Sequence, residues 1–173
     1  MMVIEVSPLI HIEIVVPDAE KAYEFLNRVF GAKKVEENIA HYLARFPAVK
    51  VVHVQLSNVI LQFIEPLTQG TIWADHLREK GPGVHNLNFN VKNVKEAGKV
   101  FKQEGLKTLF KLHLDWSQFI DSEDLRSDIP PVYMLEANDI VGFRFELQEI
   151  PYREEKTPEG HKIKKSYDLK REC

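Results

Sequence analysis

The sequence is poor in the features that define several large classes of protein. Its 173 residues include one cysteine, Cys173, which excludes a disulfide framework and a cysteine-rich zinc site. The formal net charge of −3 offers no positive surface to nucleic acid or an anionic membrane. No apolar run approaches the roughly 20 residues of a membrane-spanning helix, no basic segment of a secretory signal opens the chain, and no glycine-rich phosphate loop occurs. We therefore expect a cytoplasmic protein that acts on a small molecule, without nucleic acid or membrane partners.

What the sequence does contain begins with a strand and a helix. One face of residues 9–16 is entirely apolar, and His11 and Glu13 belong to the other face, an alternation typical of a strand. Asp18 is a suitable N-cap, and apolar residues then recur with helical spacing until Gly31, a natural C-terminal stop.

A β-hairpin is predicted for residues 49–56 and 59–65, joined by a two-residue turn. This register places His53 directly across from Gln62. One face of the hairpin is then wholly apolar and the other is mixed, a separation that a slip of one residue would destroy.

A second strand and helix repeat the first at an offset of 75 residues, which gives Asn93 the N-cap position that Asp18 has in the first. Asn86 and Asn88 share one strand face, whereas His85 shares the other with the apolar Leu87. The offset aligns His11 with Asn86 rather than with His85, so we expect His85 to point away from the face that carries His11. Neither strand-rich module could bury its sheet face alone, which predicts that the two modules pair.

The other segments receive coarser predictions. From residue 151 onward, 12 of 23 residues are charged, which predicts a mobile, strand-poor tail. Further strands are expected near 106–113, 131–137 and 142–149, a helical linker over 71–80, and a polar loop over 114–130.

Four stretches together resemble the vicinal oxygen chelate superfamily, which includes glyoxalases, methylmalonyl-CoA epimerases, extradiol dioxygenases and bleomycin-resistance proteins. The stretches are His11-Ile-Glu-Ile-Val-Val-Pro-Asp18, Gln62-Phe-Ile-Glu-Pro-Leu67, Gly83-Val-His-Asn-Leu-Asn-Phe-Asn-Val91 and Gly142-Phe-Arg-Phe-Glu-Leu147. Their order and spacing agree with the superfamily, and the motifs are most similar to those of the epimerase and glyoxalase branches.

The resemblance implies an α+β fold in which two paired βαβββ modules form a curled mixed sheet, a cup, with the helices outside. We expect one domain over 1–173. It comprises a first module at 9–67, a linker helix at 68–83, a second module at 84–150 and the charged tail at 151–173.

The resemblance also implies a divalent metal ion in the cup, with one side-chain ligand from each of four strands. His11, Gln62 and Glu146 occupy three of these positions, and Asn86 occupies the fourth, where the superfamily normally has a histidine. His53 is an alternative source of the second imidazole. Imidazole and carboxylate suit zinc, nickel, cobalt, manganese or iron, and a site without any metal is the other expectation.

Three functions follow from this set. The first is metal-assisted proton transfer next to a carbonyl, by a lyase or isomerase of glyoxalase or epimerase type, with Glu146 or Glu13 as the base and His53 as a further candidate. Asn86, Asn88 and Gln55 would line the substrate pocket. The second is a metal-free protein that binds a small molecule such as an antibiotic, and the third is a ring-cleaving dioxygenase with iron on His11, His53 and Glu146. The resemblance further implies a homodimer.

Overall fold

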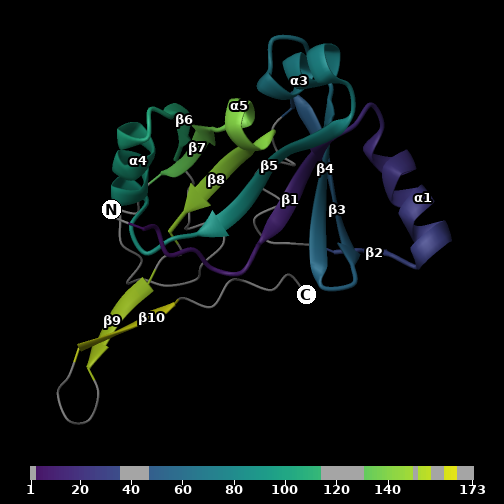
Figure 1. Ribbon diagram of the computed structural model, residues 1–173. Coiled ribbons are helices and arrows are strands. Elements are labelled where there is room, and N and C mark those ends of the chain that lie inside the picture. The colour runs from purple at the N-terminus through teal and green to yellow at the C-terminus, as the bar shows by residue number, and fades with distance from the viewer. Residues whose placement is uncertain (1–2, 36–46, 114–130, 150–151, 157–161, 167–173) are drawn as a thin grey trace.

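The computed structural model describes residues 3–35, 47–113, 131–149, 152–156 and 162–166. Its elements follow the order strand, helix, strand, strand, strand twice (Figure 1). The first module contains β1 (His11–Val15), α1 (Ala19–Phe30), β2 (Lys33–Lys34), β3 (Val49–Leu56) and β4 (Val59–Pro66). The second contains β5 (Gly83–Asn90), α4 (Val94–Gln103), β6 (Lys107–Leu112), β7 (Val132–Glu136) and β8 (Arg144–Gln148), and α3 (Ile72–Lys80) joins the two modules.

The two modules form one curled, unclosed mixed sheet. Its strand order is β2-β3-β4-β1-β5-β8-β7-β6, so each module is a reversed copy of the other about the antiparallel pair β1 and β5. Within the modules, β1 lies parallel to β4 and β5 lies parallel to β8. The predicted fold of two paired βαβββ modules is confirmed.

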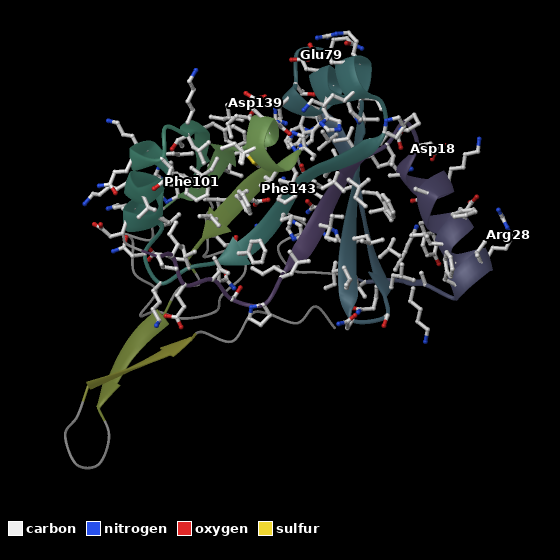
Figure 2. The ribbon with its side chains drawn as sticks, in the orientation of Figure 1. Asp18, Arg28, Glu79, Phe101, Asp139 and Phe143 are labelled. Atoms are coloured by element: carbon white, nitrogen blue, oxygen red, sulfur yellow. The ribbon has the colours of Figure 1, made fainter. Side chains whose placement is uncertain are left out.

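The helices α1 and α4 cover the same face of this sheet at its two ends (Figure 1). Under α1, the buried Val52, Val54 and Phe63 pack with Ala19 of the helix. Under α4, the buried core residues are Val91, Val94, Ala97, Tyr133, Leu135 and Leu147. The charged side chain of Arg28 lies on the side of α1 that faces away from the sheet (Figure 2). The helices α1 and α4 therefore cover the apolar face of the central strands, whereas the opposite face carries polar residues beside the buried Val15, Val49 and Ile64.

The hairpin of β3 and β4 has the predicted register. Leu56 pairs with Val59, and His53 pairs with Gln62. Because Val52, Val54 and Phe63 go to the helix-covered core, the mixed set of side chains, which includes His53 and Gln62, lies on the opposite face.

Capping residues set the helix boundaries as predicted. The Asp18 side chain accepts a hydrogen bond from the backbone N–H of Lys21, and that of Asn93 accepts one from Glu96. These bonds satisfy N–H groups that a helix leaves free at its start. Gly31 ends α1 in the left-handed conformation, with φ of 67°, which glycine adopts without steric cost.

Helix α3 closes one end of the polar face. Its Trp73 and Leu77 pack against the buried Val15, Val49 and Ile64, which lie on the side of the sheet away from α1. Within the part of the chain that the structure describes, no helix is long and apolar enough to cross a membrane.

Two features of the second half differ from the expectations. A short helix, α5 (Asn138–Val141), precedes β8. The charged tail is not strand-poor, because β9 (Tyr152–Lys156) and β10 (Lys162–Ser166) form an antiparallel pair in which Glu154 is opposite Lys164. The predicted loop at 114–130 lies outside the described residues.

Candidate functional site

A row of polar side chains crosses the face opposite α1 and α4, one from each of six strands. Register partners in neighbouring strands place them side by side, and the last two are joined by a hydrogen bond. In spatial order from β3 to β7 this polar row is His53, Gln62, Glu13, Asn86, Arg144 and Glu136. So many polar groups under cover are costly unless they bond to one another or to a ligand.

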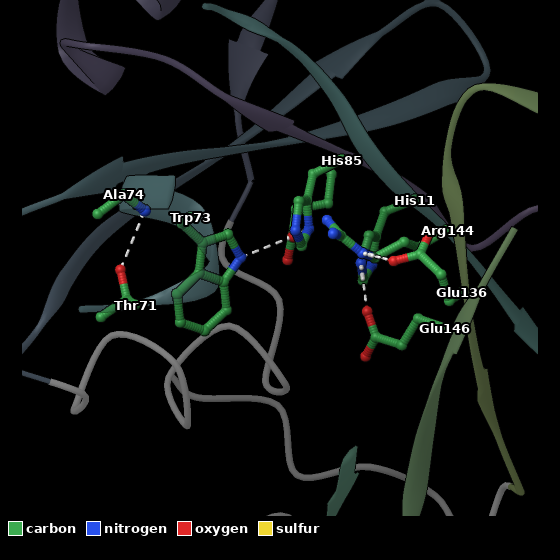
Figure 3. A network of polar contacts seen from close by, with 9 residues as sticks. His11, Thr71, Trp73, Ala74, His85, Glu136, Arg144 and Glu146 are labelled. Carbon is green, nitrogen blue, oxygen red and sulfur yellow. Dashed lines mark hydrogen bonds and ion pairs between the residues drawn. The ribbon is translucent and has the colours of Figure 1, made fainter. Parts of the chain in front are cut away.

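Next to the polar row lies a pair formed by His11 and Glu146. His11 Nε2 is 3.7 Å from Glu146 Oε2 (Figure 3), and Asn88 is the register partner of both residues. The His11 ring is edge-on to the His53 ring, with centroids 6.2 Å apart. The structure thus brings together His11 and Glu146, two residues that the sequence singles out as metal ligands.

Gln62 is held by His53, as the hairpin register predicts. The two Nε2 atoms are 2.8 Å apart in the buried interior. In this orientation of the amide, Gln62 Nε2 donates and His53 Nε2 accepts. The other end of the amide, Gln62 Oε1, is buried and has no hydrogen-bond partner among the residues that the structure describes, so it is available as a donor atom to a cation or a ligand.

These donors can be tested against a divalent ion. An imidazole nitrogen and a carboxylate oxygen on one tetrahedral ion, with bonds of about 2.1 Å, lie about 3.4 Å apart, close to the 3.7 Å between His11 and Glu146. Among the described residues, however, no three side chains of His, Cys, Asp or Glu gather into a group that could hold a metal. The third ligand would have to be Gln62 Oε1. Such a set fits an oxygen-preferring cation better than a tightly bound zinc ion.

Glu13 is the centre of a second buried network. Its Oε1 accepts a hydrogen bond from Trp73 Nε1 at 2.8 Å and lies 2.5 Å from His85 Nδ1. Burial alone would raise the pKa of Glu13, but the hydrogen bond and charge of His85, with smaller contributions from Trp73 and His11, outweigh it and lower the pKa. Glu13 is therefore an ionised carboxylate that other side chains already occupy.

The contact between His85 and Glu13 shows that the expected orientation of His85 is wrong. A β-bulge interrupts the pairing of β1 with β5, so that Glu13 pairs with Asn86 whereas Ile14 pairs with Val84. A bulge breaks the alternation of side chains at one residue. His85 and Asn86 are consequently both turned to the polar face, and only the placement of Asn86 agrees with the prediction.

His76 of α3, to which the sequence gave no role, packs edge-on against His85, with ring centroids 5.3 Å apart. Burial is the main cause that lowers its pKa from 6.5 to about 4, and the charges of His85, Lys80 and Arg144 lower it further. His76 is therefore neutral at physiological pH.

Arg144 and Glu136 are the polar-row residues that the sequence analysis missed. Arg144 Nε donates to Glu136 Oε2 at 3.0 Å (Figure 3), and Glu136 Oε1 accepts from the backbone N–H of Asn138 at the start of α5. Burial raises the pKa of Glu136, but the Asn138 N–H and the Arg144 charge lower it on balance. The signal was present in the alternation of Arg144 with Glu146 on one strand face.

The remaining pocket candidates lie in different places. Asn88 is buried beside the His11–Glu146 pair, and its Oδ1 is 3.5 Å from Gln148 Nε2. Gln55 turns to the end of the hairpin, where its Nε2 donates to the Ser57 carbonyl.

Comparison with known proteins places this chain in a family. The sequence pattern of the Glyoxalase/Bleomycin resistance protein/Dioxygenase superfamily matches residues 10–113, and the chain belongs to this superfamily. It is 29% identical over 142 residues to the mitochondrial methylmalonyl-CoA epimerase of Homo sapiens, which covers 80% of this chain and 72% of that protein.

Solved structures show the same fold. The methylmalonyl-CoA epimerase of Mycobacterium tuberculosis superposes with a TM-score of 0.60 and 19% identity, over 86% of this chain and 91% of that one. A variant of the Streptomyces coelicolor methylmalonyl-CoA epimerase in complex with 2-nitronate-propionyl-CoA superposes with a TM-score of 0.56 and 18% identity, over 83% and 96% of the chains.

Proposed function

We propose that the protein is an isomerase of epimerase type that removes and returns a proton at the carbon next to a carbonyl of an acyl thioester. The observation that carries the proposal is the pair His11 and Glu146, 3.7 Å apart on the polar face, which also carries the Gln62 oxygen that has no partner among the described residues. Membership of the superfamily and the similarity to the human epimerase support this reaction over others.

Among the candidate bases, the geometry favours Glu146 over Glu13 and His53. Glu13 is bonded to Trp73 and His85 and has a lowered pKa, which makes it a poor base. The Nε2 of His53 already accepts the amide of Gln62, so His53 orients Gln62 instead. Glu146 is partly exposed, with a side-chain accessibility of 14%, and can reach a substrate on the polar face.

His11, Gln62 and one carboxylate oxygen of Glu146 would hold a divalent cation, which when bound supplies positive charge to the enolate oxygen that forms as the proton leaves. The second oxygen of Glu146 is left to take that proton. The chain itself contributes the base and the orientation of these donors. Because the set contains one imidazole, one carboxylate and one amide, we expect it to bind any divalent ion weakly.

The test is exchange of the substrate α-proton with solvent. We would incubate the full chain with methylmalonyl-CoA in D₂O, with and without added Mn²⁺ or Co²⁺, and follow the α-proton by NMR. The Glu146→Gln variant should lose about 100-fold or more of the exchange rate, as expected when a general base is removed. The exposed Glu104 provides the matched control Glu104→Gln, which should leave the rate unchanged. Absence of exchange by the wild type under all metal conditions would contradict the proposal.

A second candidate is a metal-free protein that binds a small molecule, and the amide-rich donor set favours it. It predicts that binding of methylmalonyl-CoA is unaffected by EDTA and that no exchange occurs. A ring-cleaving dioxygenase is disfavoured, because His11, His53 and Glu146 do not form a three-ligand group in the described part of the chain. The homodimer and the cytoplasmic location stay predictions, and light scattering over a concentration series measures the first.

A further inference from the structure

Gln62 carries an amide whose two ends are nearly equal in size but opposite in chemistry. Only the oxygen has a lone pair for a cation, whereas the N–H₂ group donates hydrogen bonds and repels positive charge. The side chain is 1% exposed, so bulk water does not choose between the two ends. If Gln62 is to serve as a cation ligand, the protein itself has to select the end of the amide that stays available.

His53 is placed by the hairpin to make this selection. The pairing of β3 with β4 sets His53 directly opposite Gln62, and Gln62 Nε2 donates to His53 Nε2 at 2.8 Å. His53 is buried as well, with 4% of its surface exposed. The imidazole thus occupies the nitrogen end of the amide and leaves Gln62 Oε1 without a hydrogen-bond partner among the described residues.

A neighbouring carboxylate, Glu13, does not compete with His53 for the amide. Glu13 is the register partner of Gln62 on its other side, in β1, and a carboxylate there could accept from the N–H₂ group and turn the amide round. The Oε1 atom of Glu13 instead accepts from Trp73 Nε1 and contacts His85 Nδ1. In the described part of the chain, His53 is therefore the acceptor that holds the N–H₂ group of Gln62.

His53 supports the donors of the polar face without being one of them. Its ring is edge-on to that of His11, with centroids 6.2 Å apart, but its Nε2 is already engaged by Gln62. A nitrogen atom engaged in this way is not free to bind a cation, so His53 acts through Gln62. Side chains that orient a ligand residue change the affinity of a metal site without touching the metal.

We infer that His53 is a positioning residue that commits the nitrogen end of the Gln62 amide and thereby keeps its oxygen end available to a cation. The inference rests on the proposed function for the donor set, but its measurement needs no substrate. Without the acceptor at position 53, an amide that offers its oxygen leaves a buried N–H₂ group without a partner, which is costly. A carboxylate at position 62 would not need His53, because both of its ends are oxygen atoms.

The experiment is a titration of the full chain with Mn²⁺ alone, in which electron paramagnetic resonance measures the free ion and so gives the dissociation constant. Replacement of His53 by phenylalanine, His53→Phe, keeps an aromatic ring beside His11 and removes the acceptor. We expect this variant to bind Mn²⁺ about 10-fold or more weakly than the wild type. His53→Gln, whose side-chain carbonyl can accept from Gln62, should restore most of the affinity.

The decisive comparison repeats His53→Phe in a Gln62→Glu background. There the change should alter the Mn²⁺ affinity by less than about 2-fold, because a carboxylate presents oxygen in either orientation. His113→Phe is the matched control, since His113 is exposed directly after β6, and it should retain the wild-type affinity. His53→Leu provides a second variant without an acceptor should His53→Phe fold poorly.

Three results would overturn the inference. They are an equal loss in the two backgrounds, which would mean that His53 only supports the fold, no loss in the Gln62 background, and no binding of Mn²⁺ by the wild type. The outcomes also separate this inference from the reaction. If the affinity depends on His53 but no α-proton exchange occurs, the positioning role stands and the epimerase proposal fails. If exchange occurs and the affinity does not depend on His53, the reaction stands and the positioning role fails.

Discussion

His76 should make the protein sensitive to mild acid. Its ring is buried between α3 and the start of β5, against His85, and its pKa is lowered from 6.5 to about 4, first of all by burial. In the unfolded chain the same side chain takes up a proton near pH 6.5. Between these two values the unfolded state binds more protons than the folded state, so stability falls as the pH falls.

The size of the effect follows from the two pKa values. With an unfolded value of 6.5 and a folded value of about 4, the linkage relation gives a loss of about 2 kcal/mol on going from about pH 7.5 to about pH 5. The loss reaches about 3 kcal/mol near pH 4, where the folded state begins to protonate as well.

The assay is urea denaturation of the wild type and of His76→Phe at about pH 7.5 and pH 5. Phenylalanine keeps an aromatic ring edge-on to His85 and does not titrate, so the variant should lack this part of the acid sensitivity. All other titrating groups are common to both proteins and cancel in the difference. If the wild type and His76→Phe lose the same free energy of unfolding between the two pH values, the argument that burial keeps His76 neutral is refuted.

Three further predictions concern stability. Glu13→Ala should cost about 3–5 kcal/mol in urea denaturation, because it leaves the buried His85 without its carboxylate partner; a cost below about 1 kcal/mol would contradict this. Gly98→Ala should destabilise the protein by about 1–2 kcal/mol, because the added Cβ would lie 2.8 Å from the Tyr133 ring. This cost should outweigh the ordinary preference of helices for alanine, and a raised melting temperature would show that the ring moves aside. Glu136 has a pKa lowered from 4.5, so its stabilising contribution is present above about pH 4.5 and is lost as the pH falls through its folded pKa. The free energies of unfolding of the wild type and of Glu136→Gln should therefore differ most near neutral pH and become equal in acid. A difference that grows as the pH falls would contradict the lowered pKa of Glu136.

Most of the fold could be predicted from local patterns because the patterns obey simple periods. The apolar face of the hairpin allowed one register, and that register alone placed His53 opposite Gln62. Asp18 and Asn93 cap the two outer helices as expected.

The polar site could be predicted only in part, because two features that shape it leave no periodic pattern in the sequence. They are the β-bulge in β5 and the contacts that α3 and α5 make with the sheet. The bulge at His85 arises from the pairing of β1 with β5, strands that are far apart in the chain, and nothing in the alternation of residues 83–91 announces it. The networks of Glu13 with Trp73 and of Arg144 with Glu136 depend on how α3 and α5 meet the sheet. Strand parity indicates which face a residue occupies but not which partner it finds there.

The bulge in β5 has a consequence for how this surface can change. In a regular strand every second side chain faces a given pocket, and the side chains between them face the opposite layer. Here two consecutive positions, 85 and 86, face the same side, and their tasks are separate. His85 is bonded to the buried Glu13, whereas the amide of Asn86 has no partner among the described residues. Position 86 can therefore be substituted to accept a different ligand without dismantling the support beneath it, so the bulge gives the sheet one position at which specificity and stability vary independently.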